Sequence, residues 1–444
     1  MNRREFLHAA AALPLLAGWP RGGPRRAALP LRANGARVNA ALAAFDSVGR
    51  TAGGINRVAY SEADLAGRAF TLDLFRQAGL APRIDAAGNI VARVEGTGRG
   101  LAPLVIGSHV DSVTDGGNFD GPLGSFGAIE VARSLREQRV RLRHPLEVVV
   151  WQNEEGGTIG SKAWVGTLTP ADLDKVARSG VTIREGTGRI GGDASRLAEV
   201  VRKRVGPSAG AGQAVAGYLE LHIEQGGLLE AAGLPIGVVQ GIVGLRWMEV
   251  TIRGFANHAG ATEMNRRHDA MLAAARFTVA VNEAIRSEPG RQVATVGRLV
   301  ATPNTTNVIA GEVKLTVDLR DLDAAKIERF RLRFEQLGRE IGAATGTAFA
   351  YAPLVDSEPA LADPRMMEVV ESSARALGLT SQRMPSGAGH DAQELARIAP
   401  IGMIFVPSVG GISHSPRELT KPGDVANGVD VLLNAVVEAD RRLD

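Results

Sequence analysis

Histidine and carboxylate side chains stand where apolar segments of the chain end. Four such segments lead into candidate metal ligands, namely His109 with Asp111, Glu154 with Glu155, His222, and His414. A further acid, Asp120, lies in the glycine-rich loop Gly116–Gly124. Uninterrupted apolar runs are typical of strands buried on both faces of an α/β sheet, and sites in such sheets form beyond the carboxyl ends of the strands. Because imidazole and carboxylate groups bind divalent cations, the pattern predicts a metal site at which these residues converge.

Each of these signals taken alone has a simpler explanation. A lone histidine after a strand is more commonly structural, paired glutamates are commonly solvated, and a glycine-rich loop is commonly only a turn. The chain has only eight histidines in 444 residues, yet three of them follow apolar segments among carboxylates. It has no cysteine, which excludes thiolate ligands, disulfides and a cysteine nucleophile. The combination therefore favours metal chemistry on histidine, aspartate and glutamate.

Beyond its first residues the chain has almost no net charge. The formal charge of +3 comes from 51 basic and 48 acidic side chains, and residues 1–28 hold five arginines and one glutamate. The rest has 51 − 5 = 46 basic against 48 − 1 = 47 acidic side chains. With this balance of charges, residues 29–444 lack the excess of basic side chains that is typical of a nucleic-acid-binding protein. No apolar run approaches the roughly 18 residues of a membrane span.

The N-terminus has the layout of an export signal. The run Arg-Arg-Glu-Phe-Leu at residues 3–7 precedes a short, weakly apolar stretch at Ala9–Gly18. This layout resembles a twin-arginine signal peptide, for which a disordered basic tail is the alternative. We therefore expect residues 1–32 to direct the protein through the twin-arginine machinery of a bacterium to the periplasm. That route carries folded proteins, which suits a metalloenzyme.

The distribution of apolar residues predicts a two-domain α/β protein. Residues 33–243 and 356–444 alternate helices with buried strands, which predicts a catalytic domain built from both ends of the chain. Residues 244–355 differ, because their first strand alternates polar and apolar side chains. The elements expected there are strands at Trp247–Arg253, 292–301, 311–320 and 347–353, and helices at 266–286 and 323–343. This βαββαβ order predicts an inserted ferredoxin-like domain with helices on one face of an antiparallel sheet.

Several longer motifs resemble, in the same order, those of a known family. They are His109-x-Asp111, Gly-Gly-Asn-Phe-Asp120-Gly-Pro-Leu-Gly, Glu154-Glu155-Gly, His222-Ile-Glu-Gln225-Gly, Asn257-His258-Ala-Gly, Asn307-Val-Ile, Ser386-Gly-Ala-Gly-His-Asp and Pro-Ser-Val-Gly-Gly-Ile-Ser-His414-Ser-Pro. From about residue 36 onward the chain resembles the hydantoinase/carbamoylase-type amidases, a branch of the dinuclear M20-type metallopeptidase superfamily. This branch includes N-carbamoyl-L-amino acid hydrolases, β-ureidopropionases and allantoate amidohydrolases.

The resemblance implies two divalent metal ions per subunit. Asp120 would bridge both ions, with His109 and His222 on one and Glu155 and His414 on the other. Zinc or manganese is expected, and cobalt and nickel also accept such ligands.

Two further residues would support the metal chemistry. The resemblance implies that Asp111 accepts the second ring N–H of His109 and so fixes its tautomer. It implies that Glu154 is the general base, which takes a proton from the attacking water and passes it to the leaving nitrogen. The alternative for Glu154 is a hydrogen-bond acceptor beside the metal ligands.

The inserted domain is expected to supply substrate-binding residues. Polar residues around Arg320 share one strand face, which could equally be a solvated sheet face. The resemblance implies that Arg320 makes a bidentate contact to a substrate carboxylate, helped by Asn307 and Gln225. It also implies that His258 polarises the scissile carbonyl from a partner subunit, so that the inserted domain is both lid and dimerisation module.

The expected reaction is hydrolysis of a linear C–N bond, in an N-carbamoyl-L-amino acid or a related ureide such as allantoate or β-ureidopropionate, by a water held between the metals. His222 favours a ureide, because two cations facing only Asp120 and Glu155 leave a more positive site than three carboxylates would. An aminoacylase or dipeptidase of the same superfamily and a non-catalytic metal-binding relative are the alternatives.

Three positions depart from the usual family pattern. Glu263 and Ala310 stand where proline is usual, and Gly157-Thr-Ile follows the glutamate pair where Ser/Ala-Arg-Phe is typical. None of these is an expected ligand, so they bear on the substrate rather than on the metal chemistry.

Overall fold

The computed structural model describes residues 30–206 and 214–443. The leader predicted at residues 1–32 lies, up to residue 29, outside the described residues. The segment that follows packs on the C-terminal helix, because the N–H groups of Leu31 and Ala33 donate to Asn434 (3.1 Å) and Asp430 (2.7 Å). Within the described residues, no helix is long and apolar enough to cross a membrane.

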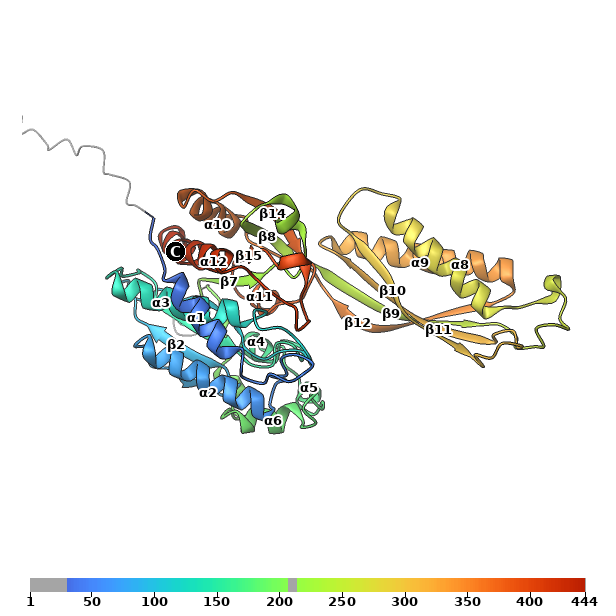
Figure 1. Cartoon of the computed structure of the whole chain (residues 1–444), viewed down its shortest axis with the longest axis horizontal. Coiled ribbons are helices and arrows are strands. Elements are labelled where there is room, and N and C mark those ends of the chain that lie inside the picture. The colour runs from blue at the N-terminus through green and yellow to red at the C-terminus, as the bar shows by residue number, and fades with distance from the viewer. Residues whose placement is uncertain (1–29, 207–213, 444) are drawn as a thin grey trace, which may run out of the picture.

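In the described part of the chain, nine strands form a mixed sheet that is the central layer of the catalytic domain (Figure 1). The strand order is β1-β2-β4-β3-β7-β15-β8-β13, and β14 also pairs with β8. The central strands β4, β3, β7 and β15 run parallel, and every residue in them is buried. The bounds are β1 (Arg83–Ile84), β2 (Ile90–Val94), β3 (Leu104–His109), β4 (Leu146–Trp151), β7 (Gly217–Ile223), β8 (Ile236–Ile242), β13 (Ala360–Leu361), β14 (Ser381–Ser386) and β15 (Ile401–Val406).

Helices cover both faces of this sheet, which explains why its central strands are apolar throughout. In β3, Leu104 and Ile106 face one core and Val105 faces the other. The first core is covered by α1 (Gly35–Phe45), α2 (Glu62–Gln77), α3 (Pro122–Glu137), α10 (Pro364–Ala376) and α12 (Pro422–Arg442). The second is covered by α4 (Ile159–Val165), α7 (Leu228–Ala232) and α11 (Asp391–Leu395). Shorter elements lie between these, namely α5 (Pro170–Leu173), α6 (Ile183–Arg189), β5 (Lys203–Arg204) and β6 (Ala214–Val215).

A second sheet belongs to the inserted segment, all of which is described. Its elements follow the predicted βαββαβ order, namely β9 (Gly244–Arg253), α8 (Ala270–Arg286), β10 (Val293–Thr302), β11 (Glu312–Asp321), α9 (Ala324–Thr345) and β12 (Ala348–Ser357). The strands pair antiparallel in the order β10-β11-β9-β12. Both helices pack on one face, where Val250, Leu315 and Phe277 are fully buried. The predicted α/β fold with an inserted ferredoxin-like domain is confirmed.

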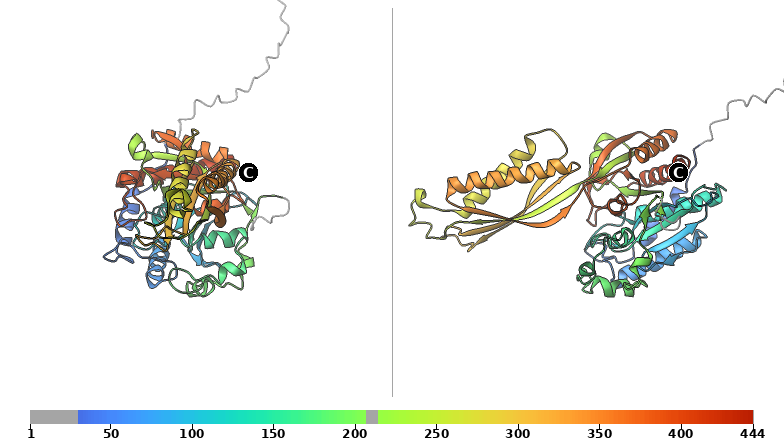
Figure 2. Two further views of the ribbon diagram at one scale, coloured as in Figure 1. Left: turned by 90° about the vertical axis from the view of Figure 1, so that its right-hand side faces the viewer. Right: turned by 180° about the vertical axis from the view of Figure 1, so that it is seen from behind.

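The inserted domain extends away from the catalytic domain in Figure 1 and in the right-hand view of Figure 2, and the left-hand view of Figure 2 looks along it. We call the end at which β9 begins and β11 and β12 end the proximal end, because β8 leads directly into β9 there. At the distal end, β9 finishes at Arg253, which pairs with Glu312 and Ala348. The loops 254–269 and 303–311 follow strands that finish at the distal end.

Candidate metal centre

Three parallel strands deliver the first candidate ligands to one edge of the catalytic sheet. β3 ends at His109, and β7 ends one residue beyond His222. β4 ends at Trp151, three residues before Glu154. Leu104 pairs with Gly217, so the same register places His109 level with His222. Their ring centroids lie 6.0 Å apart.

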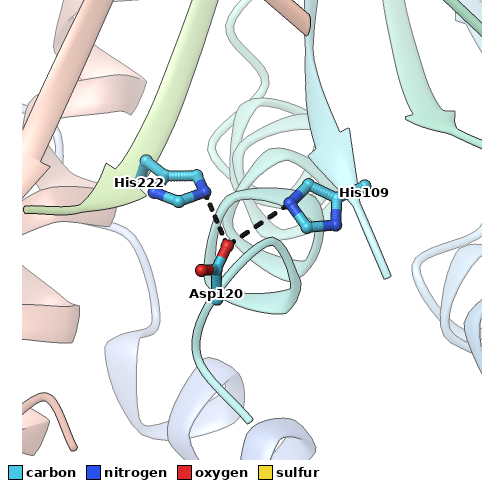
Figure 3. A group of neighbouring side chains, drawn as sticks. All are labelled: His109, Asp120 and His222. Atoms are coloured by element: carbon cyan, nitrogen blue, oxygen red, sulfur yellow. Dashed lines mark ion pairs between the residues drawn. The ribbon is translucent and has the colours of Figure 1, made fainter. Parts of the chain in front are cut away.

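Asp120 lies between these two rings (Figure 3). Its Oδ1 is 3.4 Å from Nε2 of His109 and 3.1 Å from Nε2 of His222. The loop that carries Asp120 passes against the ring of His109 at Gly121, whose φ is 83° and where a Cβ would lie 2.4 Å from Cε1 of His109. A larger residue would strain the backbone and displace the ring, so glycine is required there.

The other carboxylate oxygen of Asp120 faces a second group. Its Oδ2 lies 3.2 Å from Nε2 of His414, and this nitrogen lies 3.6 Å from Oε1 of Glu155. Among the described residues, two sets of three potential ligands therefore share Asp120, namely His109–Asp120–His222 and Asp120–Glu155–His414. The structure thus brings together all five residues that the sequence predicted as ligands.

The hydrogen bonds of the histidines fit a cation at this place. Nδ1 of His222 lies 2.9 Å from the carbonyl oxygen of Ile223, and Nδ1 of His109 lies 3.1 Å from that of Asp111. A carbonyl only accepts, so in the neutral rings Nδ1 carries the proton and Nε2 turns its lone pair towards Asp120. Nε2 of His222 is buried and has no hydrogen-bond partner among the described residues, although Oδ1 of Asp120 is 3.1 Å away. Two acceptors that face each other suit a divalent cation between them.

The cluster also carries a negative potential, which its pKa values reflect. Burial raises the pKa of Glu155 to about 7, and the charge of Asp120 adds to this. The hydrogen bond to Asp120 raises the pKa of His414 to about 9, although burial opposes it. Burial lowers the pKa of His222, but the charge of Asp120, the hydrogen bond to it and the charge of Glu220 together outweigh burial and leave this pKa above its usual value. A site that favours protonated imidazole also favours metal cations.

Asp111 supports the glutamate pair. Its two carboxylate oxygens accept the backbone N–H groups of Glu154 and Glu155, at 3.2 Å each. Nδ1 of His109 lies 3.1 Å from the carbonyl oxygen of Asp111 and 3.7 Å from its carboxylate. The structure therefore places the main-chain carbonyl of Asp111 next to the ring N–H of His109, while its carboxylate binds the next loop. Asp111 orients His109 through its backbone and the two glutamates through its side chain.

Glu154 lies on the His109 side of the cluster. Its Oε2 is 3.8 Å from Nε2 of His109, and its side chain is 10% exposed. Burial raises the pKa of Glu154 well above its usual value; His109 opposes this shift, and Asp391 and Glu155 add to it. A buried carboxyl group with a raised pKa, next to cation ligands, is suited to accept and hold a proton.

Comparison with known proteins assigns the chain to a family. The model of the family described as Peptidase family M20/M25/M40 matches residues 105–438, which is most of the chain. The protein belongs to this family. The matched residues include all five clustered candidate ligands of this M20 protein, and Glu154.

Relatives of this M20 protein match along nearly the whole chain. The N-carbamoyl-L-amino acid amidohydrolase of Geobacillus stearothermophilus is 39% identical over 408 residues, which cover 90% of this chain and 98% of the relative. The ureidoglycolate hydrolase of Oryza sativa subsp. japonica is 34% identical over 394 residues, covering 86% and 80%. The crystal structure of a hydantoinase/carbamoylase family amidase from Burkholderia multivorans matches with a TM-score of 0.84 and 36% identity, over 92% of this chain and 98% of that one.

Two of the three predicted substrate-binding residues of this M20 protein lie in or against the catalytic domain. Nε2 of Gln225 donates to Oδ2 of Asp120 at 2.6 Å. Arg320, at the proximal end of the inserted domain, forms an ion pair with Asp318 (2.8 Å) and donates through its other terminal nitrogen to the carbonyl of Gly387 (2.6 Å). Arg320 therefore stands where the two domains meet.

The third, Asn307, lies at the distal end of the inserted domain together with His258, which was predicted to polarise the carbonyl. His258 follows β9, Asn307 follows β10, and the two loops are joined by a bond from the N–H of Ala259 to the carbonyl of Asn307 (2.9 Å). Both side chains are exposed. The structure does not bring His258 or Asn307 to the metal cluster of the same chain.

Some residues of the site had no predicted role. The ring of His390 lies edge-on to that of His222, with centroids 4.4 Å apart, and its Nε2 is 2.8 Å from Oγ of Ser386. His390 lies in the Ser-Gly-Ala-Gly-His-Asp motif, so the sequence indicated that it could matter but not that it would lie next to His222. Glu418 is buried beside Asp120 and follows no strand, so the strand-end pattern could not indicate it.

Proposed function

We propose that this M20 protein is a metal-dependent amidohydrolase that cleaves the C–N bond of a ureido or amide substrate. The observation that carries the proposal is the carboxyl group of Glu154, only 10% exposed and next to His109, at a cluster in which three imidazoles share the carboxylate of Asp120. Relatives named N-carbamoyl-L-amino acid amidohydrolase and ureidoglycolate hydrolase support ureides as the substrate class. The expected substrate is an N-carbamoyl-L-amino acid, or a related ureide that carries a carboxylate, such as allantoate or β-ureidopropionate.

Two divalent cations would be held by the clustered ligands. His109, Asp120 and His222 would hold one, and Asp120, Glu155 and His414 the other, with zinc or manganese as the expected ions and cobalt or nickel as alternatives. Such ions supply Lewis acidity, which polarises a carbonyl and lowers the pKa of water.

Glu154 would move the proton that the reaction requires. Its carboxylate takes a proton from the attacking water, whose oxygen forms a bond to the carbonyl carbon of the substrate. When the C–N bond breaks, Glu154 returns this proton to the leaving nitrogen. Asp111 keeps Glu154 in place, because it binds the backbone N–H of Glu154.

Arg320 would bind the carboxylate of the substrate. A guanidinium group makes paired hydrogen bonds to a carboxylate. Arg320 is bonded on one side to Asp318 and on the other to the carbonyl of Gly387, so a substrate would replace the contact with Gly387. Gln225, next to the shared Asp120, would bind the polar part of the substrate.

We further propose that the active protein is a homodimer. His258 and Asn307 stand at the distal end of the inserted domain, so a second copy would have to bring them to the metal cluster. His258 would then polarise the scissile carbonyl, and Asn307 would assist Arg320.

A substrate panel tests the proposed reaction. The purified protein, loaded in turn with zinc, manganese, cobalt or nickel, is assayed on N-carbamoyl-L-amino acids, allantoate, N-acyl amino acids and dipeptides, with the Glu154→Gln variant as control. Hydrolysis of ureides that Glu154→Gln lacks supports the proposal. Preferred cleavage of acyl amino acids or dipeptides would make it an aminoacylase or dipeptidase, and a wild-type protein with no turnover would be a non-catalytic relative.

We also propose that the N-terminal leader directs export of the protein. The run Arg-Arg-Glu-Phe-Leu at residues 3–7 supports the twin-arginine route to the periplasm. Replacing Arg3 and Arg4 by lysine should then keep the protein in the cytoplasmic fraction of a bacterial host. Equal amounts of wild-type and variant protein in the periplasmic fraction would exclude this route.

A further inference from the structure

A buried carboxylate, Glu418, joins two of the loops that carry the clustered ligands. It lies four residues after His414 and is 6% exposed. Its Oε1 accepts the backbone N–H groups of Phe119 (2.8 Å) and Asp120 (3.0 Å), and its Oε2 accepts the hydroxyl of Ser413 (2.9 Å). One side chain thus binds the backbone of the shared ligand and the residue before His414, although Asp120 and Glu418 are 298 positions apart in the chain.

Both loops are shaped around this carboxylate. The Asp120 loop comes so close that a Cβ at Gly117 would lie 2.3 Å from Cβ of Glu418, so only glycine fits there. In the other loop, the N–H of Glu418 donates to the carbonyl of Ser415 (3.0 Å). His414 has a φ of 50°, a left-handed conformation that a non-glycine residue keeps only where its surroundings fix it. The loop of His414 therefore depends on anchors such as Glu418.

The hydroxyl of Ser413 stands between two carboxylates. Its Oγ lies 2.9 Å from Oε2 of Glu418 and 3.2 Å from Oδ2 of Asp120. A serine hydroxyl has one proton to donate, and the shorter distance assigns it to Glu418. Oδ2 of Asp120 then accepts the bond from Gln225 (2.6 Å) and keeps a second lone pair for a cation that Glu155 and His414 would also ligate.

We infer that Glu418 is a positioning residue that sets the geometry of the metal centre through Asp120 and His414. This inference rests on the proposed function, because it presumes that the cluster binds cations. Hydrogen bonds from backbone N–H groups to a carboxylate are charge-assisted and strong, and residues that orient metal ligands raise metal affinity. Without Glu418, the buried N–H of Asp120 and the partly buried N–H of Phe119 lose their partner, and both loops lose a common anchor. The cation held by Asp120, Glu155 and His414 is affected most, because both of these loops supply it.

Zinc binding to the full-length protein tests the inference. The affinity of each ion is measured by competition with a chromophoric chelator, and Tm is measured in parallel. Glu418→Ala should weaken the second ion about 10- to 100-fold, the range typical of residues behind metal ligands. Glu418→Gln keeps one oxygen for the two N–H groups, so its affinity should lie between those of Glu418→Ala and the wild type. Ser413→Ala should cause a smaller loss in the same direction.

Glu130 offers a matched control. It is 4% exposed and also accepts one backbone N–H (Asn34, 3.0 Å) and one serine hydroxyl (Ser134, 2.7 Å), but it also pairs with Arg37 (2.7 Å) and lies on α3 away from the cluster. Glu130→Ala should lower Tm and leave both zinc affinities at the wild-type values.

The outcomes separate the inference from the proposed function. If Glu418→Ala binds both zinc ions with wild-type affinity, the inference is wrong. It is also wrong if Glu130→Ala loses as much zinc affinity as Glu418→Ala, because the loss would then reflect general destabilisation. If Glu418→Ala does not fold, Glu418→Gln and Ser413→Ala decide by the same criterion. A wild-type protein that binds no zinc and none of the other three metals overturns the proposed function, and the inference with it.

Discussion

His258 stands too far from the metal cluster of its own subunit to act on a substrate there. It follows the distal end of β9, a strand of ten residues. At about 3.3 Å per residue, the distal end lies about 30 Å from the proximal end. Arg320, at the proximal end, is already in contact with the catalytic domain. If His258 polarises the scissile carbonyl, a second copy of the chain must supply it.

Two inactive variants should therefore restore activity when their subunits are mixed. His258→Ala lacks the group that polarises the carbonyl, and Glu154→Gln lacks the base. In a two-fold dimer of one variant with the other, one site combines an intact Glu154 with the partner's intact histidine, and the other site lacks both. Random pairing of equal amounts makes half of the dimers mixed, each with one intact site of two, so about a quarter of wild-type activity is expected.

The assay uses co-expressed subunits that carry different affinity tags. Mixed dimers purified through both tags should have about half the activity of the wild-type dimer on an N-carbamoyl-L-amino acid, because one of two symmetric sites is intact. A dimer that mixes Glu154→Gln with Glu155→Gln is the control, because both changes lie in the same cluster and each site keeps one defect. Inactive mixed dimers, or a monomer with full wild-type activity, would refute the reasoning.

Three further outcomes follow from the site. Glu154→Gln should keep its metal and lower kcat about 10²–10⁴-fold, the usual value of general-base catalysis, whereas Glu155→Gln should lose metal. Metal analysis beside rate measurements checks this, and equal behaviour of the two variants contradicts the separation of base from ligand. Arg320→Ala should raise KM about 10- to 100-fold for substrates with a carboxylate, as expected for a lost charge-assisted pair, and much less for their amide analogues. Steady-state kinetics measures both values, and an unchanged KM for the carboxylate substrates would contradict this role of Arg320. Chelation should abolish activity and added zinc or manganese should restore it, while activity that survives complete metal removal, verified by elemental analysis, contradicts the metal-dependent reaction.

The inserted domain shows where sequence patterns locate elements and where they miss their ends. A helix was expected from residue 266, but α8 begins at Ala270, because the side chain of Asp269 caps it by accepting the N–H groups of Met271 and Leu272. The last strand was expected to finish at Pro353, yet β12 continues to Ser357. β12 is an edge strand with a bulge at this proline, and an edge strand tolerates a residue without an N–H. Neither feature leaves a periodic signal.

The clustering of the candidate metal ligands was accessible from the sequence. His109 and His222 end buried parallel strands, and such strands finish at one edge of the sheet, so residue type and position were sufficient to predict their convergence. The resemblance added the separate roles of Glu154 and Glu155, which spacing alone does not distinguish.

Tertiary structure decided what holds these ligands and how far the remaining residues lie from them. Asp111 binds the backbone of the glutamate loop, and Glu418 binds the backbone of the Asp120 loop across 298 positions. Backbone N–H groups are identical at nearly every residue, so their partners cannot be recognised from residue types. The distance of His258 from the cluster depends on the length and direction of β9 in the folded chain. Sequence therefore determined which side chains can bind a metal, and the fold determined how they are held together and that His258 lies on a strand leading away from them.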